Sequence, residues 1–293
     1  MKKWISAVAC LIIIACSSII AVSCHDDGPH IATTPSLDVI IIAGQSNAEY
    51  TVERCTPETI QELYPQYPEH NLYYYGTSEY PQTYWQYENN NYSLSKSDLH
   101  PMWSNNRWMI GGYEPYIANE TSKIRGNDVL IVNTGVGGKM ISELLPNAPF
   151  GNYGMAAINS ALDSASTSYS QINMLYWIWI QGEADYNTPV EQYIDDFIML
   201  QSKFDEYGLD NCYIVHTRDM WGGNANIAQK QLSDNDSHIT IVAECTESFS
   251  LEEGGCLLDE PGAYGIHYSC KGRFVISKEI ISSINLTGLD TNP

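Results

Sequence analysis

The stretch Leu37-Asp38-Val39-Ile40-Ile41-Ile42-Ala43, followed by Gly44-Gln45-Ser46-Asn47-Ala48, decides the fold class of this chain. The first seven residues are mostly apolar and β-branched, which is typical of a strand that is buried on both faces. In an open α/β sheet, ligands bind outside the carboxyl ends of the parallel strands. The sequence therefore places Ser46 where a nucleophile would lie. A polar turn with a capping serine is the alternative interpretation.

Four further apolar runs predict the remaining strands of the sheet. They cover residues 128 to 134, 173 to 181, 211 to 217 and 238 to 244, and segments with helical periodicity lie between them. This alternation is expected of a parallel sheet that is covered by helices on both faces. We therefore predict an α/β fold, a three-layer α/β/α sandwich around a central, mainly parallel five-stranded sheet.

Two helices have the clearest sequence signals. Thr188-Pro189-Val190-Glu191 has the pattern of a capping box with proline at the first helical position, and Gly208 is the expected stop. A last helix is expected after His267 and continues to Ile284.

Polar segments follow two other predicted strands, and a histidine lies before the last helix. These segments are Asn133-Thr134-Gly135-Val136-Gly137-Gly138, Gln181-Gly182-Glu183-Ala184-Asp185 and Gly265-Ile266-His267-Tyr268-Ser269. The glycine-rich segment does not fit a phosphate loop, because Asn133 replaces the first required glycine and Met140 the Ser/Thr. The Ser46 segment also fails the G-x-S-x-G pattern of ordinary α/β-hydrolases at its last position.

Taken together, these motifs resemble the sialate O-acetylesterase-like branch of the SGNH hydrolases, which is related to acetylxylan esterases. The resemblance rests on four motifs: Gly-Gln-Ser-Asn at 44–47, Val-Gly-Gly-x-x-Ile at 136–141, Trp-Ile-Gln-Gly-Glu-x-Asp at 179–185 and Gly-Ile-His-Tyr-Ser at 265–269. It implies the SGNH hydrolase fold and a carbohydrate O-acetylesterase that acts on sialic acid or on a plant polysaccharide. An acyl-serine mechanism needs neither a cofactor nor a metal.

The resemblance also assigns the catalytic roles. A serine hydroxyl is a poor nucleophile until a neighbouring imidazole accepts its proton, so Ser46 attacks and His267 acts as general base and then as general acid. The developing oxyanion needs fixed donors. The resemblance assigns these to the backbone N–H groups of Ser46 and Gly138, with Gly137 as the alternative, and to the Gln181 side chain.

Several neighbouring residues are expected to hold the strand ends in place around these groups. They are Gln45, Asn47, Gly137, Glu183 and Asp185. Direct participation of Glu183 in the reaction is the alternative for that residue.

The third member of a catalytic triad departs from the family pattern. The family usually places an aspartate two or three residues before the histidine, and this chain has no acidic residue there. Asp259 or Glu260 can replace it, because Pro261-Gly262 can form a turn that brings the chain back toward His267. A Ser–His dyad with the imidazole held by a backbone carbonyl is the alternative.

An aromatic-rich insertion is predicted at residues 60 to 113. The stretch from Tyr64 to Tyr92 contains nine of the 21 tyrosines. Aromatic faces bind the apolar faces of sugars, so Tyr84, Trp85 and Arg107 are the predicted substrate-binding residues. Alternatively, the rings close a small core over the sheet.

The first 23 residues predict a lipoprotein signal peptide, because two lysines precede an apolar stretch from Trp4 to Val22. Ala21-Val22-Ser23-Cys24 resembles a bacterial lipoprotein box, which implies acylation of Cys24 and a membrane contact through lipid. An uncleaved membrane anchor is the alternative. We expect an extracytoplasmic, outer-membrane lipoprotein, facing the surface or the periplasm. A tether at 24–35, the hydrolase domain at 36–287 and a tail at 288–293 would follow.

Charge and cysteine content restrict the partners further. The formal net charge of −21 makes nucleic acid an unfavourable partner. Five cysteines follow Cys24, and their spacing predicts neither the disulfide connectivity nor a zinc site. The sequence does not predict the oligomeric state. Two other functions remain open: a lipid esterase or thioesterase of the same superfamily, and a non-catalytic glycan-binding surface lipoprotein.

Overall fold

The computed structural model describes residues 36–49, 55–76, 98–252, 255–258 and 265–286, together with the backbone of 85–88 and 91–94. The predicted leader, tether and tail, and with them Cys24, lie outside the described residues. Among the helices of the described part, none combines the length and the apolar character needed to cross a membrane.

A seven-stranded sheet lies at the centre of the described part, in the order β11-β10-β9-β1-β8-β2-β5. All five predicted strands form and pair in parallel: β1 (Ser36–Gly44), β8 (Asp128–Asn133), β9 (Gln171–Ile180), β10 (Cys212–Val215) and β11 (Ile239–Val242). The predicted number of five strands is wrong by two. β2 (Leu72–Gly76) adds in parallel to β8, and β5 (Asp98–Pro101) pairs antiparallel with β2. Both come from within the predicted insertion and lack the aliphatic runs that mark the other strands: β2 is mostly tyrosine, and β5 has the sequence Asp-Leu-His-Pro.

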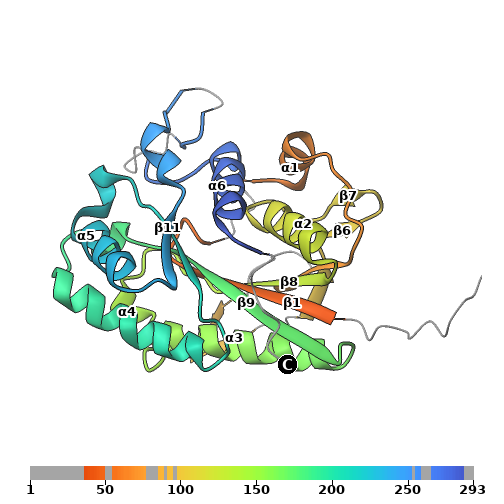
Figure 1. Cartoon of the computed structure of the whole chain (residues 1–293), viewed down its shortest axis with the longest axis horizontal. Coiled ribbons are helices and arrows are strands. Elements are labelled where there is room, and N and C mark those ends of the chain that lie inside the picture. The colour runs from red at the N-terminus through yellow and green to blue at the C-terminus, as the bar shows by residue number, and fades with distance from the viewer. Residues whose placement is uncertain are drawn as a thin grey trace, which may run out of the picture. The chain divides into compact units, whose positions relative to one another are not determined.

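Helices cover both faces of the sheet, which confirms the three-layer α/β/α prediction (Figure 1). One face carries α1 (Pro57–Leu63), α2 (Glu114–Arg125) and α6 (Cys270–Ser283). The other carries α3 (Pro149–Ser166), α4 (Val190–Asp205) and α5 (Asp219–Asn235). Three short 3-10 helices also form: η1 (Ile141–Glu143), η2 (Glu183–Asp185) and η3 (Glu244–Ser248). Two pairs of antiparallel strands lie outside the main sheet. They are β3 (Trp85–Glu88) with β4 (Asn91–Leu94), and β6 (Trp103–Ser104) with β7 (Arg107–Trp108).

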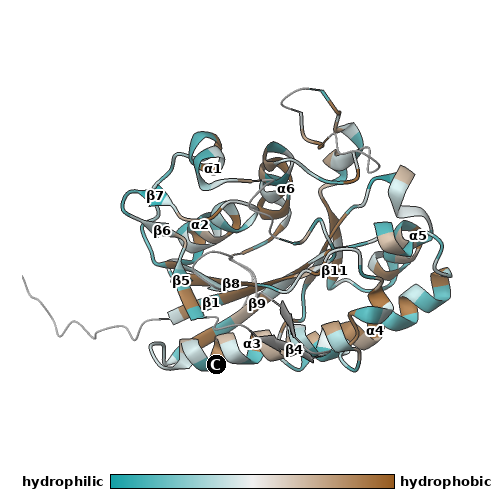
Figure 2. Ribbon diagram, turned by 180° about the vertical axis from the view of Figure 1, so that it is seen from behind, coloured by the Kyte–Doolittle hydropathy of each residue, from teal (hydrophilic) through white to brown (hydrophobic). Residues whose placement is uncertain are grey.

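The aliphatic run of β1 follows from its burial on both faces. Successive side chains of a strand point to opposite sides. Ile40 and Ile42 therefore pack in the core under α2 and α6, whereas Val39 and Ile41 pack in the core under α3 and α4. Figure 2 shows the hydrophobic strands between helices whose outer surfaces are more hydrophilic.

The start of α4 differs from the predicted capping box. The helix is preceded by Pro189 as its N-cap, with no side-chain capping hydrogen bond. The Thr188 hydroxyl instead donates to Asp185 Oδ1 at 2.7 Å. Thr188 thus belongs to the polar turn that follows β9, because both its hydroxyl and its backbone N–H bond Asp185 three residues earlier. The last predicted helix forms as α6, capped by the Ser269 side chain.

Several rings of the aromatic-rich stretch are core residues. Tyr64, Tyr74 and Tyr75 are buried, and the Trp108 indole N–H donates to the Tyr64 carbonyl at 2.9 Å. Tyr67 is exposed. The buried rings, but not Tyr67, therefore fit the alternative in which the aromatic residues close a core over the sheet.

Candidate active site

The nucleophile turn begins at a glycine that no other residue could replace without distortion. Gly44 has φ +137°, and a Cβ atom there would lie 2.0 Å from the Ile180 carbonyl oxygen of β9. The next residue, Gln45, donates its backbone N–H to that same carbonyl at 3.0 Å. Gln45 O then accepts from the backbone N–H groups of Ala48 and Glu49, at 2.8 and 2.9 Å. This tight turn places Ser46, half-buried, at the carboxyl end of β1.

The structure brings the predicted nucleophile and base within hydrogen-bond distance. Ser46 Oγ lies 3.0 Å from His267 Nε2, although the two residues are 221 positions apart in the sequence. Both residues are half-buried, so the pair is reachable from solvent. With the ring proton on Nδ1, Nε2 can accept the serine proton, which is the arrangement that general-base catalysis requires.

A short antiparallel bridge holds the histidine segment. Leu257 pairs with Tyr268, Leu258 donates its N–H to the His267 carbonyl at 2.9 Å, and Gly265 donates to the Leu258 carbonyl at 3.2 Å. Leu258 and Gly265, the described residues on either side of 259–264, therefore bond each other next to His267. Asp259 and Glu260 lie outside the described residues, so their role as orienting acid stays a prediction.

Asn47 joins the three segments that meet at the site. Its amide nitrogen donates to Glu183 Oε1 at 2.6 Å and to the Ile266 carbonyl at 2.8 Å, and its oxygen accepts from Tyr268 N at 3.1 Å. Asn47 is fully buried, so these bonds are shielded from competing water. This geometry fits the positioning role expected for Asn47.

Two of the predicted oxyanion donors have backbone N–H groups that are available to donate a hydrogen bond to a ligand. In the part of the chain that the structure describes, the N–H groups of Ser46 and Gly138 have no protein acceptor. A Cβ at Gly137 would lie 2.5 Å from Glu49 Oε2 and 3.7 Å from Ser46 Cβ, so the loop after β8 passes against the nucleophile turn. Gly138 has φ +69° and faces open space.

Gln181 is held differently from these two donors. Its side chain is buried, and Nε2 donates to the Lys139 carbonyl at 3.3 Å and to Asp185 Oδ2. Its Oε1 accepts from the Tyr193 hydroxyl at 2.8 Å. Both amide hydrogens already have protein acceptors, so this arrangement supports a positioning role. Donation from Gln181 to an oxyanion stays a prediction that requires a change of partner.

Asp185 and Gln45 link the same strand ends. Asp185 Oδ2 also accepts from Ile141 N at 2.8 Å, which fixes the loop that carries Gly138. Gln45 Oε1 accepts from Ala184 N at 3.1 Å, which ties the nucleophile turn to the end of β9.

Glu183 has an unusual environment for a carboxyl group. Burial raises its pKa, and the hydrogen bond from Asn47 opposes that shift. Within the described ranges, its Oε2 is buried and has no hydrogen-bond partner.

Sequence reasoning missed several residues that support the site. The sequence did not single out Tyr193 within its helix, yet its hydroxyl also accepts from Gln229 Nε2 at 2.8 Å and from Trp179 Nε1 at 3.1 Å. The Tyr113 hydroxyl donates to the Asn47 carbonyl at 3.0 Å, and Asn133 Nδ2 donates to the Ala48 carbonyl at 2.8 Å. For Asn133 a signal existed, because it opens the polar segment after β8.

The predicted substrate-binding residues are not brought to this site by the described part. Arg107 is exposed in the β6–β7 hairpin, which lies toward the end of the sheet where β1 begins (Figure 1). Tyr84 and the side chain of Trp85 lie outside the described residues. Their roles stay predictions.

One group of side chains in the described ranges has a metal-ligating composition. Potential ligand atoms of His216, Asp219 and Glu247 lie within 4.8 Å of one another. Glu247 Oε1 already accepts from the backbone N–H of Asp219, at the start of α5. This hydrogen bond explains why Glu247 lies beside Asp219 without a bound ion.

Solved structures share this fold at low sequence identity. A protein from Arabidopsis thaliana has a TM-score of 0.53 and 12% identity, over 86% of this chain and 99% of its own. NanS has a TM-score of 0.57 and 15% identity, over 85% of this chain and 97% of its own. A carbohydrate acetylesterase from Xanthomonas citri has a TM-score of 0.52 and 15% identity, over 82% of this chain and 54% of its own. No protein-family model and no curated protein matches the sequence. The shared property is the α/β fold, which by itself does not fix the reaction.

Proposed function

We propose that this chain is a carbohydrate O-acetylesterase that uses Ser46 as nucleophile and His267 as base. The observation that carries the proposal is the 3.0 Å separation of Ser46 Oγ and His267 Nε2 at the carboxyl end of β1. The fold shared with the carbohydrate acetylesterase from Xanthomonas citri supports the substrate class. The four sequence motifs point to sialic acid or a plant polysaccharide as the acetylated carbohydrate.

The reaction follows from the geometry. Ser46 Oγ attacks the acetyl carbonyl carbon while its proton passes to His267 Nε2. The oxyanion accepts hydrogen bonds from the Ser46 and Gly138 backbone N–H groups, each worth about 2.7–4 kcal/mol in comparable sites. The imidazolium then protonates the leaving sugar oxygen. In the second half, His267 activates a water molecule that releases acetate from Ser46.

An acidic side chain completes the triad in this proposal if it accepts from the other ring nitrogen of His267. Asp259 and Glu260 are the candidates, because they directly follow Leu258, whose backbone N–H donates to the His267 carbonyl. We expect Asp259→Asn or Glu260→Gln to lower kcat strongly. If both variants keep the wild-type kcat, the enzyme is a Ser–His dyad.

The proposed location is the outer membrane, with Cys24 acylated and the protein bound through lipid alone. Several acyl chains would be needed for stable anchoring, because a single chain binds only marginally. Mass spectrometry of the mature protein tests this, and an unmodified Cys24 would exclude it.

The activity itself is tested on a small activated acetate ester and on a panel of acetylated glycans. Wild-type protein should hydrolyse both, and Ser46→Ala should retain less than about 0.1% of the rate. The matched control is Ser282→Ala, which removes a hydroxyl that only caps a carbonyl at the end of α6. Hydrolysis of long-chain acyl esters in preference to acetates would indicate a lipid esterase. Absence of any ester turnover would favour a glycan-binding protein.

A further inference from the structure

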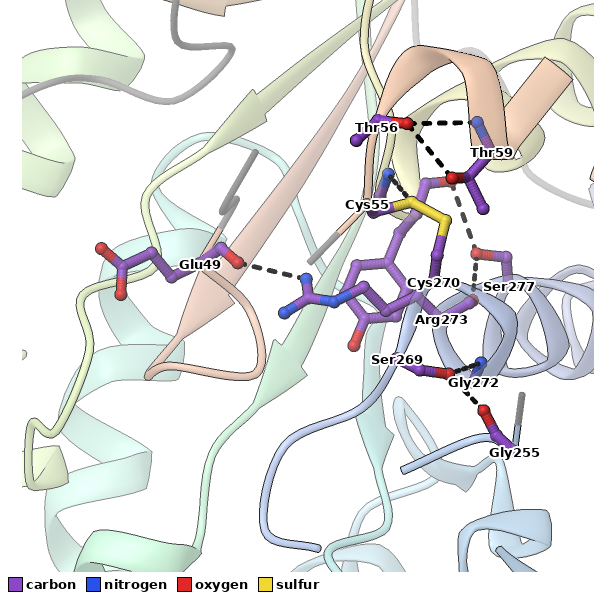
Figure 3. The surroundings of a disulfide bond; sticks show 12 residues. Glu49, Cys55, Thr56, Thr59, Gly255, Ser269, Cys270, Gly272, Arg273 and Ser277 are labelled. Carbon is purple, nitrogen blue, oxygen red and sulfur yellow. Dashed lines mark hydrogen bonds between the residues drawn. A yellow bond between two sulfur atoms is a disulfide. The ribbon is translucent and has the colours of Figure 1, made fainter. Parts of the chain in front are cut away.

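A disulfide joins the two segments that carry the catalytic pair. Cys55 is bonded to Cys270 across a sequence separation of 215 residues (Figure 3). Cys270 is the first residue of α6, three positions after His267, and Cys55 comes nine positions after Ser46. The remaining cysteines of the described part, Cys212, Cys245 and Cys256, are free thiols.

A second contact from the same helix reaches the same segment. Arg273 Nη1 donates to the Glu49 carbonyl at 3.1 Å, beside the disulfide in Figure 3. The guanidinium lies 5.0 Å from the centre of the Tyr113 ring, and Tyr113 in turn donates to the Asn47 carbonyl. The first turn of α6 is therefore fixed to the part of the chain that directly follows Ser46.

This arrangement bears directly on catalysis. The Ser46 Oγ to His267 Nε2 contact is a single hydrogen bond between side chains from the two joined segments. A misplacement of about 1 Å between reacting groups can cost about 10²-fold in rate. A covalent link close to both residues removes much of the freedom that would allow such a misplacement.

We propose that Cys55 and Cys270, through their cross-link, and Arg273, through its Glu49 contact, are positioning residues that hold His267 against Ser46 before substrate binds. This inference rests on the proposed esterase function. Both half-cystines are buried, with 2% and 5% of their surface exposed. A dithiol in solution therefore has little access to them, and the cross-link acts as a permanent clamp. The cross-link forms by thiol–disulfide exchange with an oxidised disulfide in an extracytoplasmic compartment. The two cysteine thiols lose two protons and two electrons, and the external disulfide takes them up and becomes two thiols.

The test removes the disulfide but keeps the hydrogen bond that Cys55 accepts from the Gly112 backbone. Cys55 Sγ accepts from the Gly112 backbone N–H at 3.1 Å, so Cys55→Ser preserves an acceptor there, and Cys270→Ala removes the partner sulfur. In the double variant, kcat on an activated acetate ester should fall by about tenfold or more, and KM should change less than about twofold. The rate at which a serine-directed organophosphate labels Ser46 should fall by a similar factor.

Two controls separate positioning from folding. Cys245→Ser combined with Cys256→Ser removes two free thiols and should leave kcat and labelling unchanged. Circular dichroism at the assay temperature must show the cross-link variant folded. If that variant does not fold, Arg273→Lys serves instead, since a lysine is too short to keep the Glu49 contact and should lower kcat in the same selective way.

The outcomes distinguish the two proposals. A folded cross-link variant with full kcat, full labelling rate and only a lower melting temperature would show that the disulfide merely stabilises the fold. Unchanged kcat in Arg273→Lys would overturn the inference where the double variant does not fold. If wild-type protein hydrolyses no acetate ester but cutting the cross-link still slows labelling of Ser46, the proposed function fails and the positioning role stands.

Discussion

Two polar clusters meet at the carboxyl edge of the sheet and differ in how their hydrogen bonds are used. At the end of β1, Ser46 and His267 are half-buried and are joined by one hydrogen bond. At the end of β9, Gln181, Asp185 and Tyr193 are buried, and the Gln181 side chain bonds both of the others. Both clusters arise from similar-looking polar segments after apolar strands.

The comparison teaches where chemistry can occur. Groups that stay partly exposed, with donors that have no protein acceptor, can bind and transform a substrate. Groups that satisfy one another in a buried network hold the strands in place, and breaking such a network leaves polar atoms without partners. The predictions below test this division, beginning with the half-buried cluster.

The largest effect is expected for His267→Ala. Removal of the base should lower kcat/KM for an activated acetate ester by about 10⁴-fold or more, as for Ser46→Ala, because the two residues act as a unit. The double variant Ser46→Ala with His267→Ala should lose no more than either single variant. Additive losses would show that the two side chains act independently, which contradicts the hydrogen-bonded pair.

A smaller effect, mainly on stability, is expected in the buried cluster. Tyr193→Phe removes the hydroxyl that bonds Gln181, Gln229 and Trp179, and should lower the free energy of unfolding by about 1–3 kcal/mol. Urea denaturation measures this, and kcat should change little.

Gln181→Ala sharpens the same comparison. If Gln181 only positions the loop, its loss should resemble that of Tyr193→Phe in stability and kcat. If it also donates to the oxyanion, kcat should fall by about 10²–10³-fold beyond that of Tyr193→Phe. The second result would place Gln181 in the reacting cluster.

Glu183→Gln should change the pH dependence of stability. Burial raises the pKa of Glu183, so the folded chain keeps this proton to a higher pH than the unfolded chain does. Its contribution to stability therefore falls as pH rises from about 4.3 through the raised pKa. The amide oxygen of Gln can still accept from Asn47, so the variant should gain stability over wild type as pH rises from about 4 to 8. A pH-independent difference in urea denaturation would contradict this assignment.

The smallest effect is expected for the predicted substrate-binding residues. Tyr84→Ala with Trp85→Ala should raise KM for an acetylated glycan by about three- to tenfold, because ring stacking contributes about 0.5–1.5 kcal/mol. A small acetate ester should be unaffected. Arg107→Ala, tested in the same way, shows whether the β6–β7 hairpin contributes to binding. Equal effects on both substrates would indicate a structural role for these residues.

The sequence by itself determined the five parallel strands, the last helix and the position of Ser46 after β1. These features depend on local signals, namely β-branched runs, apolar periodicity and a polar turn, which a short window of residues contains. The motifs also singled out His267, the partner that Ser46 meets across 221 residues.

Only the tertiary structure decided which polar atoms are satisfied and which remain available. It showed that β2 and β5 extend the sheet, that Thr188 bonds Asp185 instead of capping α4, and that Cys55 pairs with Cys270. It also showed that the Gln181 amide is already bonded to Lys139 and Asp185. The pairing of β2 with β8, the Cys55–Cys270 bond and the Gln181–Lys139 bond join segments that only the folded sheet brings together. Thr188 and Gln181 lie three and four residues from Asp185, but their bonds depend on the turn that follows β9, and no residue pattern predicted that turn.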